Sequence, residues 1–309
     1  MNLAIAPDRI AEMQSAVLDW YAANGRDLAF RRTTDPWAIL VSEVMAQQTQ
    51  AARAAEAWTS FMSEFPNPVS LAAASPAAVI RAWRGLGHNR RAIALRAAAV
   101  AIVEDHRGRV PDDVEALERL PGVGPYTARA VVAIAFGRPV AALDVNIRRV
   151  LGRAFLPGAL PPRALQVAAD AIVPSDWPGA WTHALMDIGA ACCRPSNPRC
   201  AICPLQARCT YATSASDARP PMEAAPVSSD RPRQLRFEST TRWLRGRIVD
   251  RLRDAPDDAW IRFAEPIGEH DVRAVELAIT TLARDGLIEL DPRSDGLTAR
   301  FSAATPTST

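Results

Sequence analysis

Leu120-Pro-Gly-Val-Gly-Pro-Tyr126 joins two segments in which apolar residues recur every three or four positions. That spacing is typical of helices. Gly122 and Gly124 permit backbone angles that other residues avoid, and they let a ligand approach the main chain. Pro125 suits the first turn of the second helix, where its missing N–H leaves no partner unsatisfied. Because free N–H groups at the start of a helix attract anions, this turn predicts a phosphate site.

Helical periodicity continues on both sides of the turn. It predicts helices over 10–22, 50–62, 89–104, 114–120, 126–136, 145–156, 163–173 and 180–191. No alternation of strands and helices is visible, which excludes a Rossmann fold or a barrel. A plain turn is the alternative, but the ordered combination of helix, glycine-rich turn and helix resembles the helix-hairpin-helix motif, which grips one DNA strand.

The composition limits the class of protein. With 309 residues, 49% of them hydrophobic, the chain can build one large or two modest domains and is too apolar for disorder. No apolar run approaches the roughly 20 residues that span a bilayer, and the N-terminus lacks the pattern of a signal peptide. All 36 basic residues are arginine, so no lysine nucleophile is available. We expect a cytoplasmic, nucleoid-associated protein that binds no membrane, although a net charge of +2 does not by itself indicate nucleic acid.

Two carboxyl groups stand in contrasting surroundings. Glu43 is the only charged residue between Trp37 and Ala46, so burial is expected to raise its pKa and favour the protonated form, unless it points into solvent. Asp144 precedes a helical segment, where a capping carboxylate accepts backbone hydrogen bonds and stays ionised. It could be no more than a cap. An acid and an anion together are what cleavage of a glycosidic bond requires.

Polar and basic stretches offer candidate nucleic-acid contacts. The uncharged side chains of Gln47–Gln50 could read base edges or fill a gap in a base stack, with a solvated turn as the alternative. Seven arginines crowd residues 81–109, which predicts a local basic face or a solvated helix surface. Arg148, Arg149 and Arg153 suit a surface that faces phosphates.

The five cysteines fall within 18 residues, at Cys192, Cys193, Cys200, Cys203 and Cys209. A clustered, odd number in a reducing compartment favours a metal site over disulfides. Four thiolates suit zinc or an iron–sulfur cluster, and the single close pair favours the cluster, with Cys192 left over.

The C-terminal part differs in composition from the rest. We expect a helical domain over 1–212, a linker over 213–233 that is rich in Ala, Ser and Pro, and a small module over 234–309. Within the module the pattern predicts two helices, 239–254 and 270–286. Two short strands follow, 287–290 and 297–301, and the arrangement resembles a winged-helix α/β module.

Four motifs in this order resemble the helix-hairpin-helix, iron–sulfur DNA glycosylases. They are Ser42-Glu-Val-Met-Ala-Gln-Gln-Thr-Gln50, Leu120-Pro-Gly-Val-Gly-Pro-Tyr-Thr-Ala128, Leu143-Asp-Val-Asn-Ile-Arg-Arg-Val150 and the cysteine loop of residues 193–209. The resemblance covers about 1–212 and implies a mostly helical, two-lobed fold with DNA bound across the cleft. Within that superfamily the chain is most similar to the adenine DNA glycosylases. They remove adenine mispaired with 8-oxoguanine or guanine in double-stranded DNA, and on this resemblance we expect a monomer.

The resemblance implies catalytic roles for four residues. Glu43 matches the general acid that protonates adenine and later activates water. Asp144 matches the carboxylate that stabilises the sugar cation, and Asn146 matches its partner. Tyr126 occupies the position where a related branch carries a lysine nucleophile, so the resemblance implies base removal without lysine-dependent strand cleavage.

The resemblance also implies binding residues. Substrate or DNA contacts fall on Arg31, Gln47, Gln48, Thr49, Leu86, His88, Gly122, Gly124 and Asp187. The ligands of a 4Fe-4S cluster fall on Cys193, Cys200, Cys203 and Cys209. The chain departs from the pattern at His88-Asn89, where the family has two tyrosines, and residues 234–309 show no pattern of the family's usual Nudix-like domain.

Two other functions fit part of the sequence pattern. A thymine or uracil mismatch glycosylase of the same superfamily would share the Tyr126 and Asp144 positions. A non-enzymatic iron–sulfur protein that binds DNA or senses redox state would need no catalytic carboxylates. Glu43 together with Asp187 favours the adenine glycosylase.

Overall fold

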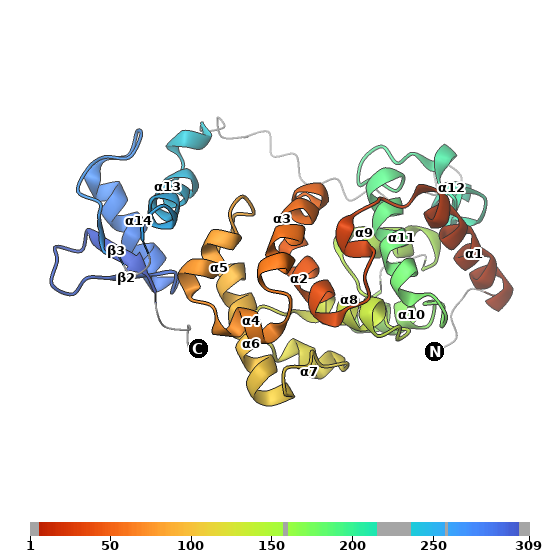
Figure 1. Ribbon diagram of the computed structural model, residues 1–309. Coiled ribbons are helices and arrows are strands. Elements are labelled where there is room, and N and C mark those ends of the chain that lie inside the picture. The colour runs from red at the N-terminus through yellow and green to blue at the C-terminus, as the bar shows by residue number, and fades with distance from the viewer. Residues whose placement is uncertain (1–5, 157–159, 215–235, 257–258, 303–309) are drawn as a thin grey trace. The chain divides into compact units, whose positions relative to one another are not determined.

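The computed structural model describes residues 6–156, 160–214, 236–256 and 259–302 (Figure 1). The chain forms two compact units. The first unit contains Met1–Glu43, Pro111–Arg119 and Val123–Val227, and the second contains Val44–Val110, Leu120–Gly122 and Ser228–Thr309. Most of the linker expected over 213–233 lies outside the described residues. No helix in the described ranges is long and apolar enough to cross a membrane.

The first unit is a bundle of helices centred on α11. Its elements are α1 (Pro7–Asn24), η1 (Ala29–Arg31), the greater part of α2 (Pro36–Ala46), α7 (Val114–Glu118), α8 (Pro125–Ala135), α9 (Val145–Ala154), α10 (Pro162–Asp170), α11 (Pro178–Ala191), η2 (Cys200–Ile202), η3 (Gln206–Arg208) and α12 (Thr210–Thr213). Helix α11 packs against α1, α8 and α9 (Figure 1). Its fully buried Trp181 meets Phe155 edge to face at 5.8 Å between ring centroids, a favourable aromatic geometry.

The turn before α8 confirms one glycine prediction and corrects the other. Gly122 has φ +78°, and a Cβ there would lie 2.8 Å from the Cβ of Ala94, so only glycine fits. Gly124 has φ −95°, and a Cβ there would meet no atom of the described residues within 4 Å, so its backbone does not require glycine. It is the N-cap of α8, and Pro125 occupies the first turn as expected.

The second unit combines helices with a small sheet. Its elements are α3 (Ala51–Glu64), α4 (Pro68–Ala73), α5 (Pro76–Ala82), α6 (Arg90–His106), η5 (Phe237–Ser239), α13 (Thr241–Arg253), β1 (Ile261–Arg262), α14 (Val272–Arg284), β2 (Ile288–Leu290) and β3 (Thr298–Phe301). Periodicity did not predict α4 and α5, because helices of six and seven residues are too short to show it. Their start signals were present, since Asn67 and Ser75 cap them and a proline follows each cap.

The C-terminal module contains the expected helices and hairpin. Strand β3 pairs antiparallel with β2, and it also pairs with β1, which gives the order β1-β3-β2. The two-residue strand β1 was missed, because its pairing is with β3 far along the chain and not with a sequence neighbour.

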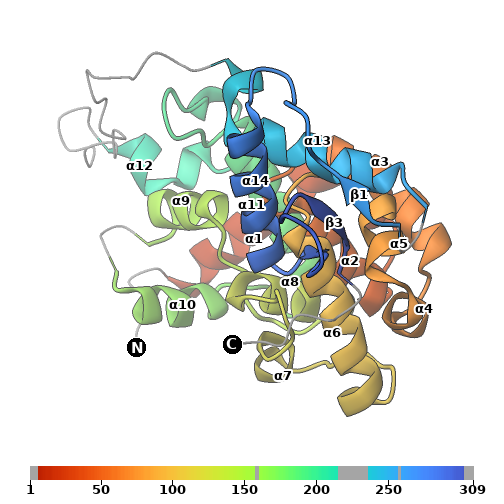
Figure 2. The ribbon, with the colours of Figure 1, turned by 90° about the vertical axis from the view of Figure 1, so that its left-hand side faces the viewer.

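The module shares a hydrophobic core with α5 and α6. Ile80 and Ile93 pack in one buried cluster with Leu244, Ile248 and Phe263. Helix α13 lies against α5 (Figure 2). Burial of so many apolar side chains is the main force that holds the module to these helices.

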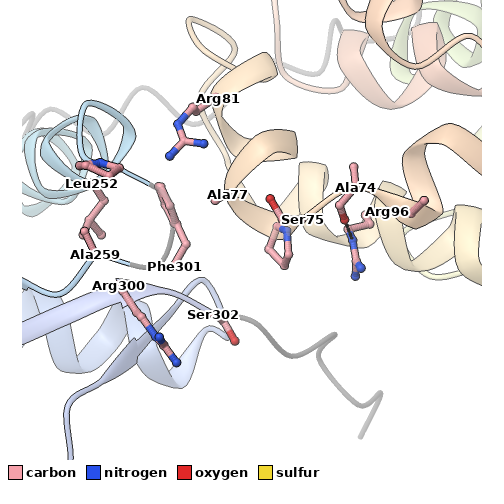
Figure 3. A pocket seen from close by; sticks show the side chains of 13 residues that line it. Ala74, Ser75, Ala77, Arg81, Arg96, Leu252, Ala259, Arg300, Phe301 and Ser302 are labelled. Atoms are coloured by element: carbon pink, nitrogen blue, oxygen red, sulfur yellow. Dashed lines mark hydrogen bonds between the residues drawn. The ribbon is translucent and has the colours of Figure 1, made fainter.

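Arginine side chains also join the C-terminal module to α5 and the residues that follow it. Arg253 donates to the carbonyl oxygen of Ile80 at 3.1 Å, and Arg81 donates to the carbonyl oxygen of Arg253 at 3.0 Å. Arg84 pairs with Asp254 at 2.6 Å. A cavity of about 230 Å³ lies beside these contacts, lined by residues that include Arg81, Arg96 and Arg300 (Figure 3). Three arginines of the basic face expected over 81–109, namely Arg81, Arg84 and Arg96, therefore bind other residues of the protein.

Candidate active site

Glu43 lies in a strongly apolar helix, α2. Helix α2 begins where Asp35 accepts a hydrogen bond from the N–H of Ala38 at 2.7 Å, and almost every residue from Trp37 to Met45 is buried. Glu43 itself is only 8% exposed, so the alternative of a solvent-facing side chain is wrong. Burial raises the pKa of Glu43 from its ordinary value to about 7, as predicted.

Three neighbours adjust that pKa. A hydrogen bond from Tyr126 and the positive charge of Arg31 oppose the rise, while the negative charge of Asp144 adds to it. These three residues act on Glu43 from α8, η1 and the start of α9, so the structure brings the predicted acid and the predicted anion into one site. The carboxyl group is left balanced between its two protonation states near neutral pH.

Tyr126 supplies a permanent hydroxyl donor to this site. It is in the first turn of α8, next to Pro125, so the glycine-rich turn fixes its position. Burial raises the pKa of Tyr126 well above its usual range, and the neighbouring charges of Glu43 and Asp144 raise it further. Its hydroxyl also lies 3.2 Å from the sulfur of Met186. A phenol that remains protonated can orient Glu43 but cannot act as a nucleophile.

Asp144 is the N-cap of α9, as predicted. Its Oδ1 accepts a hydrogen bond from the N–H of Ile147 at 2.6 Å, and its Oδ2 accepts one from Nδ2 of Asn146 at 3.0 Å. Arg149 in turn donates to Oδ1 of Asn146 at 2.8 Å. These two donors hold the Asp144 carboxylate in one orientation at the N-terminus of α9.

Asp187 forms ion pairs with two arginines, Arg26 and Arg31. It is 2% exposed on α11, and its oxygens accept hydrogen bonds from Arg31 at 2.7 and 3.0 Å and from Nε of Arg26 at 2.7 Å. Burial opposes ionisation, but hydrogen bonds from Arg31 and Arg26 outweigh it and lower the pKa of Asp187. The expected adenine contact is therefore also the counter-ion that holds Arg31 beside Glu43.

Two further residues in this region were not anticipated. The His183 side chain is buried, and burial together with the charge of Arg31 lowers its pKa to about 3, so the imidazole is neutral. The ring of Tyr21 lies 5.8 Å from the Arg31 guanidinium carbon. The spacing of His183 and Asp187, four residues apart on one helix, was the available signal.

The remaining predicted contacts belong to the second unit. Gln48 and His88 are exposed, Leu86 is buried, and Gln47 and Thr49 are half-buried. One guanidinium, that of Arg91, hydrogen-bonds both the 47–49 turn and the 86–87 segment.

The five cysteines lie in one loop, from the end of α11 to α12. Cys203 and Cys209 are close enough to Cys193 for its thiol to raise the pKa of each, after the larger effect of burial. In the described residues no group of three or more His, Cys, Asp or Glu side chains is placed to hold a single metal ion. Arg149 donates to the carbonyl oxygen of Cys193 at 2.6 Å.

Arg153 reaches the same loop. It donates to the carbonyl oxygens of Arg194 at 2.7 Å and Pro195 at 3.1 Å. The expectation that Arg149 and Arg153 face phosphates is wrong for these side chains, because their N–H groups donate to carbonyl oxygens of the cysteine loop. Arg148 on the same helix remains exposed.

Comparison with known proteins places this site in a family. Residues 41–173 match the model of the HhH-GPD superfamily of base excision DNA repair proteins. The chain is 36% identical over 277 residues to the adenine DNA glycosylase of Mycolicibacterium smegmatis, with 88% of this chain and 91% of the relative covered. The adenine DNA glycosylase of Mycobacterium tuberculosis is 38% identical over 287 residues, with 88% of each covered. The chain belongs to the adenine DNA glycosylase family.

Other members of the superfamily match a shorter part of the chain. A solved thermostable thymine-DNA glycosylase superposes with a TM-score of 0.62 at 30% identity, over 66% of this chain and 97% of that one. An endonuclease III–DNA complex superposes with a TM-score of 0.57 at 22% identity, over 66% of this chain and 95% of that one, and supports the fold. The alignments with the mycobacterial family members, at 277 and 287 residues, are longer than the helical domain of residues 1–212.

Proposed function

We propose that the chain is a monofunctional adenine DNA glycosylase, which hydrolyses the N-glycosidic bond of an adenine mispaired with 8-oxoguanine or guanine in duplex DNA. The observation that supports this most is the pairing of a buried Glu43, whose pKa is about 7, with the capping carboxylate of Asp144 in one site. Family membership supports adenine as the base.

The proposed reaction uses these residues in two steps. The substrate adenine must first leave the base stack, because its glycosidic bond is out of reach inside a duplex. Protonated Glu43 gives its proton to a ring nitrogen of adenine, the C1′–N bond breaks, and the base leaves with the bonding electrons. The sugar becomes an oxocarbenium-like cation that the Asp144 carboxylate stabilises. Water then attacks C1′, and Glu43 recovers a proton from it.

Adenine suits this acid better than thymine does. A ring nitrogen of adenine can accept a full proton and turn the base into a good leaving group, whereas thymine offers only weakly basic carbonyl oxygens. The buried Glu43, half protonated near neutral pH, is the donor that the adenine reaction requires.

A base-release assay over a panel of mispairs tests the proposal. Purified protein should release adenine from adenine:8-oxoguanine and adenine:guanine duplexes. In the Glu43→Gln variant the rate of base release should fall by at least about a hundredfold, as expected for loss of a general acid. The variant should still bind the duplex. Release of thymine alone from a thymine:guanine duplex would favour the thymine glycosylase, and binding without release of any base would favour the non-enzymatic function.

A 4Fe-4S cluster bound by Cys193, Cys200, Cys203 and Cys209 is part of the proposal. The four thiols lie in one loop, and such a cluster binds each thiolate to a different iron, so the sulfurs need not converge on one point as for zinc. The cluster would hold the loop between α11 and α12 together, and Arg149 and Arg153 would fix that loop on α9. A yellow-brown protein that absorbs near ~400 nm supports the cluster, whereas a colourless protein that contains zinc contradicts it.

Other assignments complete the proposal. We assign substrate or DNA contacts to the site residues named from the resemblance, and the winged-helix-like module of residues 234–309 to the DNA-binding surface. The module presents Arg242 on α13, close enough to lower the pKa of His88, although burial and Arg91 act more strongly. A monomer in the cytoplasm, associated with the nucleoid, is the corresponding expectation. Arg242→Gln, at an exposed position of the module, should reduce the dependence of DNA affinity on salt, because fewer phosphates would be contacted.

A further inference from the structure

Arg91, in the first turn of α6, holds the turn that follows α2. Its Nη1 donates hydrogen bonds to the carbonyl oxygens of Val44 at 2.9 Å, Met45 at 3.0 Å and Gln47. Its Nη2 donates to the hydroxyl of Thr49 at 3.1 Å. A single side chain thus satisfies several carbonyl groups that the end of a helix leaves without backbone partners.

The same guanidinium holds a second segment. Nη2 of Arg91 donates to the carbonyl oxygens of Leu86 at 3.1 Å and Gly87 at 3.3 Å. The guanidinium carbon lies 5.5 Å from the ring centroid of Trp83, and Nε1 of Trp83 also donates to the Gly87 carbonyl, at 3.1 Å. We call the two segments, residues 47–50 and 85–89, the probe loops. Arg91 is the side chain that they share.

Arg91 makes these contacts without an anion. Within the described residues it has no carboxylate partner, and its buried Nε has no hydrogen-bond acceptor. Burial lowers the pKa of Arg91, and no neighbouring charge offsets this. The six oxygen acceptors therefore stand in for a counter-ion, because a partly buried cation needs polar partners.

Both probe loops carry an unusual backbone at an exposed position. Gln48 has φ +53° and His88 has φ +46°, in the left-handed region that residues other than glycine rarely adopt. Such strained residues persist only where the surroundings determine their conformation, and they concentrate at functional sites. Here the hydrogen bonds from Arg91 lie on both sides of Gln48, at Gln47 and Thr49, and directly before His88, at Leu86 and Gly87.

We propose that Arg91 is a positioning residue, which locks Gln48 and His88 as the two tips of one rigid probe that enters the DNA duplex beside the extruded adenine. The role in base extrusion rests on the proposed function, whereas the coupling of the two loops does not. A probe that is already ordered in the free protein loses little conformational entropy when it binds DNA. It can also compensate for the unstacking that extrusion requires.

Hydrogen exchange on the free protein tests the coupling of the loops. Arg91→Lys keeps the charge but replaces a planar fork with a single ammonium group, which cannot reach all six acceptors. We expect amide exchange to rise in both probe loops together, by about fivefold or more, as hydrogen bonds to them are lost. If Arg91→Lys does not fold, Arg91→Gln, which removes the buried charge and keeps a planar amide, takes its place.

Arg96→Lys is the matched control. Arg96 lies on the same helix and donates to the carbonyl oxygens of Ala74 at 2.7 Å and Ala72 at 3.3 Å, at the end of α4 (Figure 3). The control should leave exchange in the probe loops unchanged. Exchange that rises equally in both variants, or that rises in one probe loop alone in Arg91→Lys, would overturn the proposal.

Single-turnover base release on an adenine:8-oxoguanine duplex tests the consequence. Arg91→Lys should slow release by about tenfold to a hundredfold, which is what misplacement of a binding element by about 1 Å can cost, while affinity for undamaged duplex stays the same. Arg96→Lys should keep the wild-type rate. An unchanged rate in Arg91→Lys would refute the role in extrusion. If the wild-type protein released no adenine, the proposed function would fail, and the exchange experiment would still decide the coupling.

Discussion

Replacement of Glu43 by glutamine is expected to stabilise the folded protein at alkaline pH. Burial raises the pKa of Glu43 from 4.5 to about 7, so the folded state binds a proton more tightly than the unfolded state. The stability that this proton provides is complete below about pH 4.5 and is lost as the pH rises to about 7. The two pKa values differ by about 2.5, which at 1.36 kcal/mol per unit corresponds to about 3 kcal/mol.

Glu43→Gln removes this penalty, because a neutral amide resembles the protonated acid and has nothing to ionise. Relative to the wild type, the free energy of unfolding should rise by about 3 kcal/mol at pH 8 and by less than about 1 kcal/mol at pH 5. Urea denaturation at the two pH values measures the difference. Glu56→Gln is the control, since Glu56 is exposed on α3.

The result that would refute the reasoning is an equal effect of Glu43→Gln at both pH values, or a loss of stability at pH 8. Either outcome would mean that the carboxylate is not desolvated in the folded protein. The same variant is expected to lose base release, so stability and activity should change in opposite directions, as they do where function requires a strained site.

Three other outcomes follow from the structure. The rate of base release should fall about tenfold between pH 6 and pH 8, because the protonated fraction of an acid with a pKa of about 7 falls by that factor; a rate that is flat over this range would exclude Glu43 as the acid. Asp187→Asn should lower the free energy of unfolding by about 3 kcal/mol, since it leaves the buried Arg31 without its counter-ion, and thermal unfolding against an exposed control such as Asp19→Asn would show it. Gly122→Ala should cost about 2 kcal/mol or more, because its Cβ would clash with Ala94 at positive φ, whereas Gly124→Ala should cost much less.

The local features of the active site could be predicted from the sequence. Glu43 stood alone among apolar residues, which was enough to predict its burial and raised pKa. Asp144 preceded an amphipathic segment, which was enough to predict an N-cap. Both predictions depend only on residues that are close in the chain, where chemistry and spacing determine the local structure.

Long-range partners could not be predicted in the same way. The pairing of Asp187 with Arg31 joins positions 156 residues apart, and nothing in either local pattern points to the other. The same holds for Arg91, whose acceptors lie up to 47 residues away. Gly124 shows a different limit, because its predicted need for a special backbone angle came from the Gly-x-Gly pattern alone. Gly122 adopts the positive φ that the turn requires, and Gly124 adopts an extended conformation.

Many arginines of this chain bind main-chain carbonyl oxygens within the protein, which a count of charges does not show. Five arginines, namely Arg81, Arg91, Arg96, Arg149 and Arg153, each donate to two or more main-chain carbonyl oxygens. A planar guanidinium offers five donors in a wide fork, whereas an ammonium group offers three around a single nitrogen. These side chains fasten loops and helix ends, so they contribute less to phosphate binding than their number indicates. The slope of DNA affinity against salt should therefore correspond to far fewer contacts than the 36 arginines of the chain would allow.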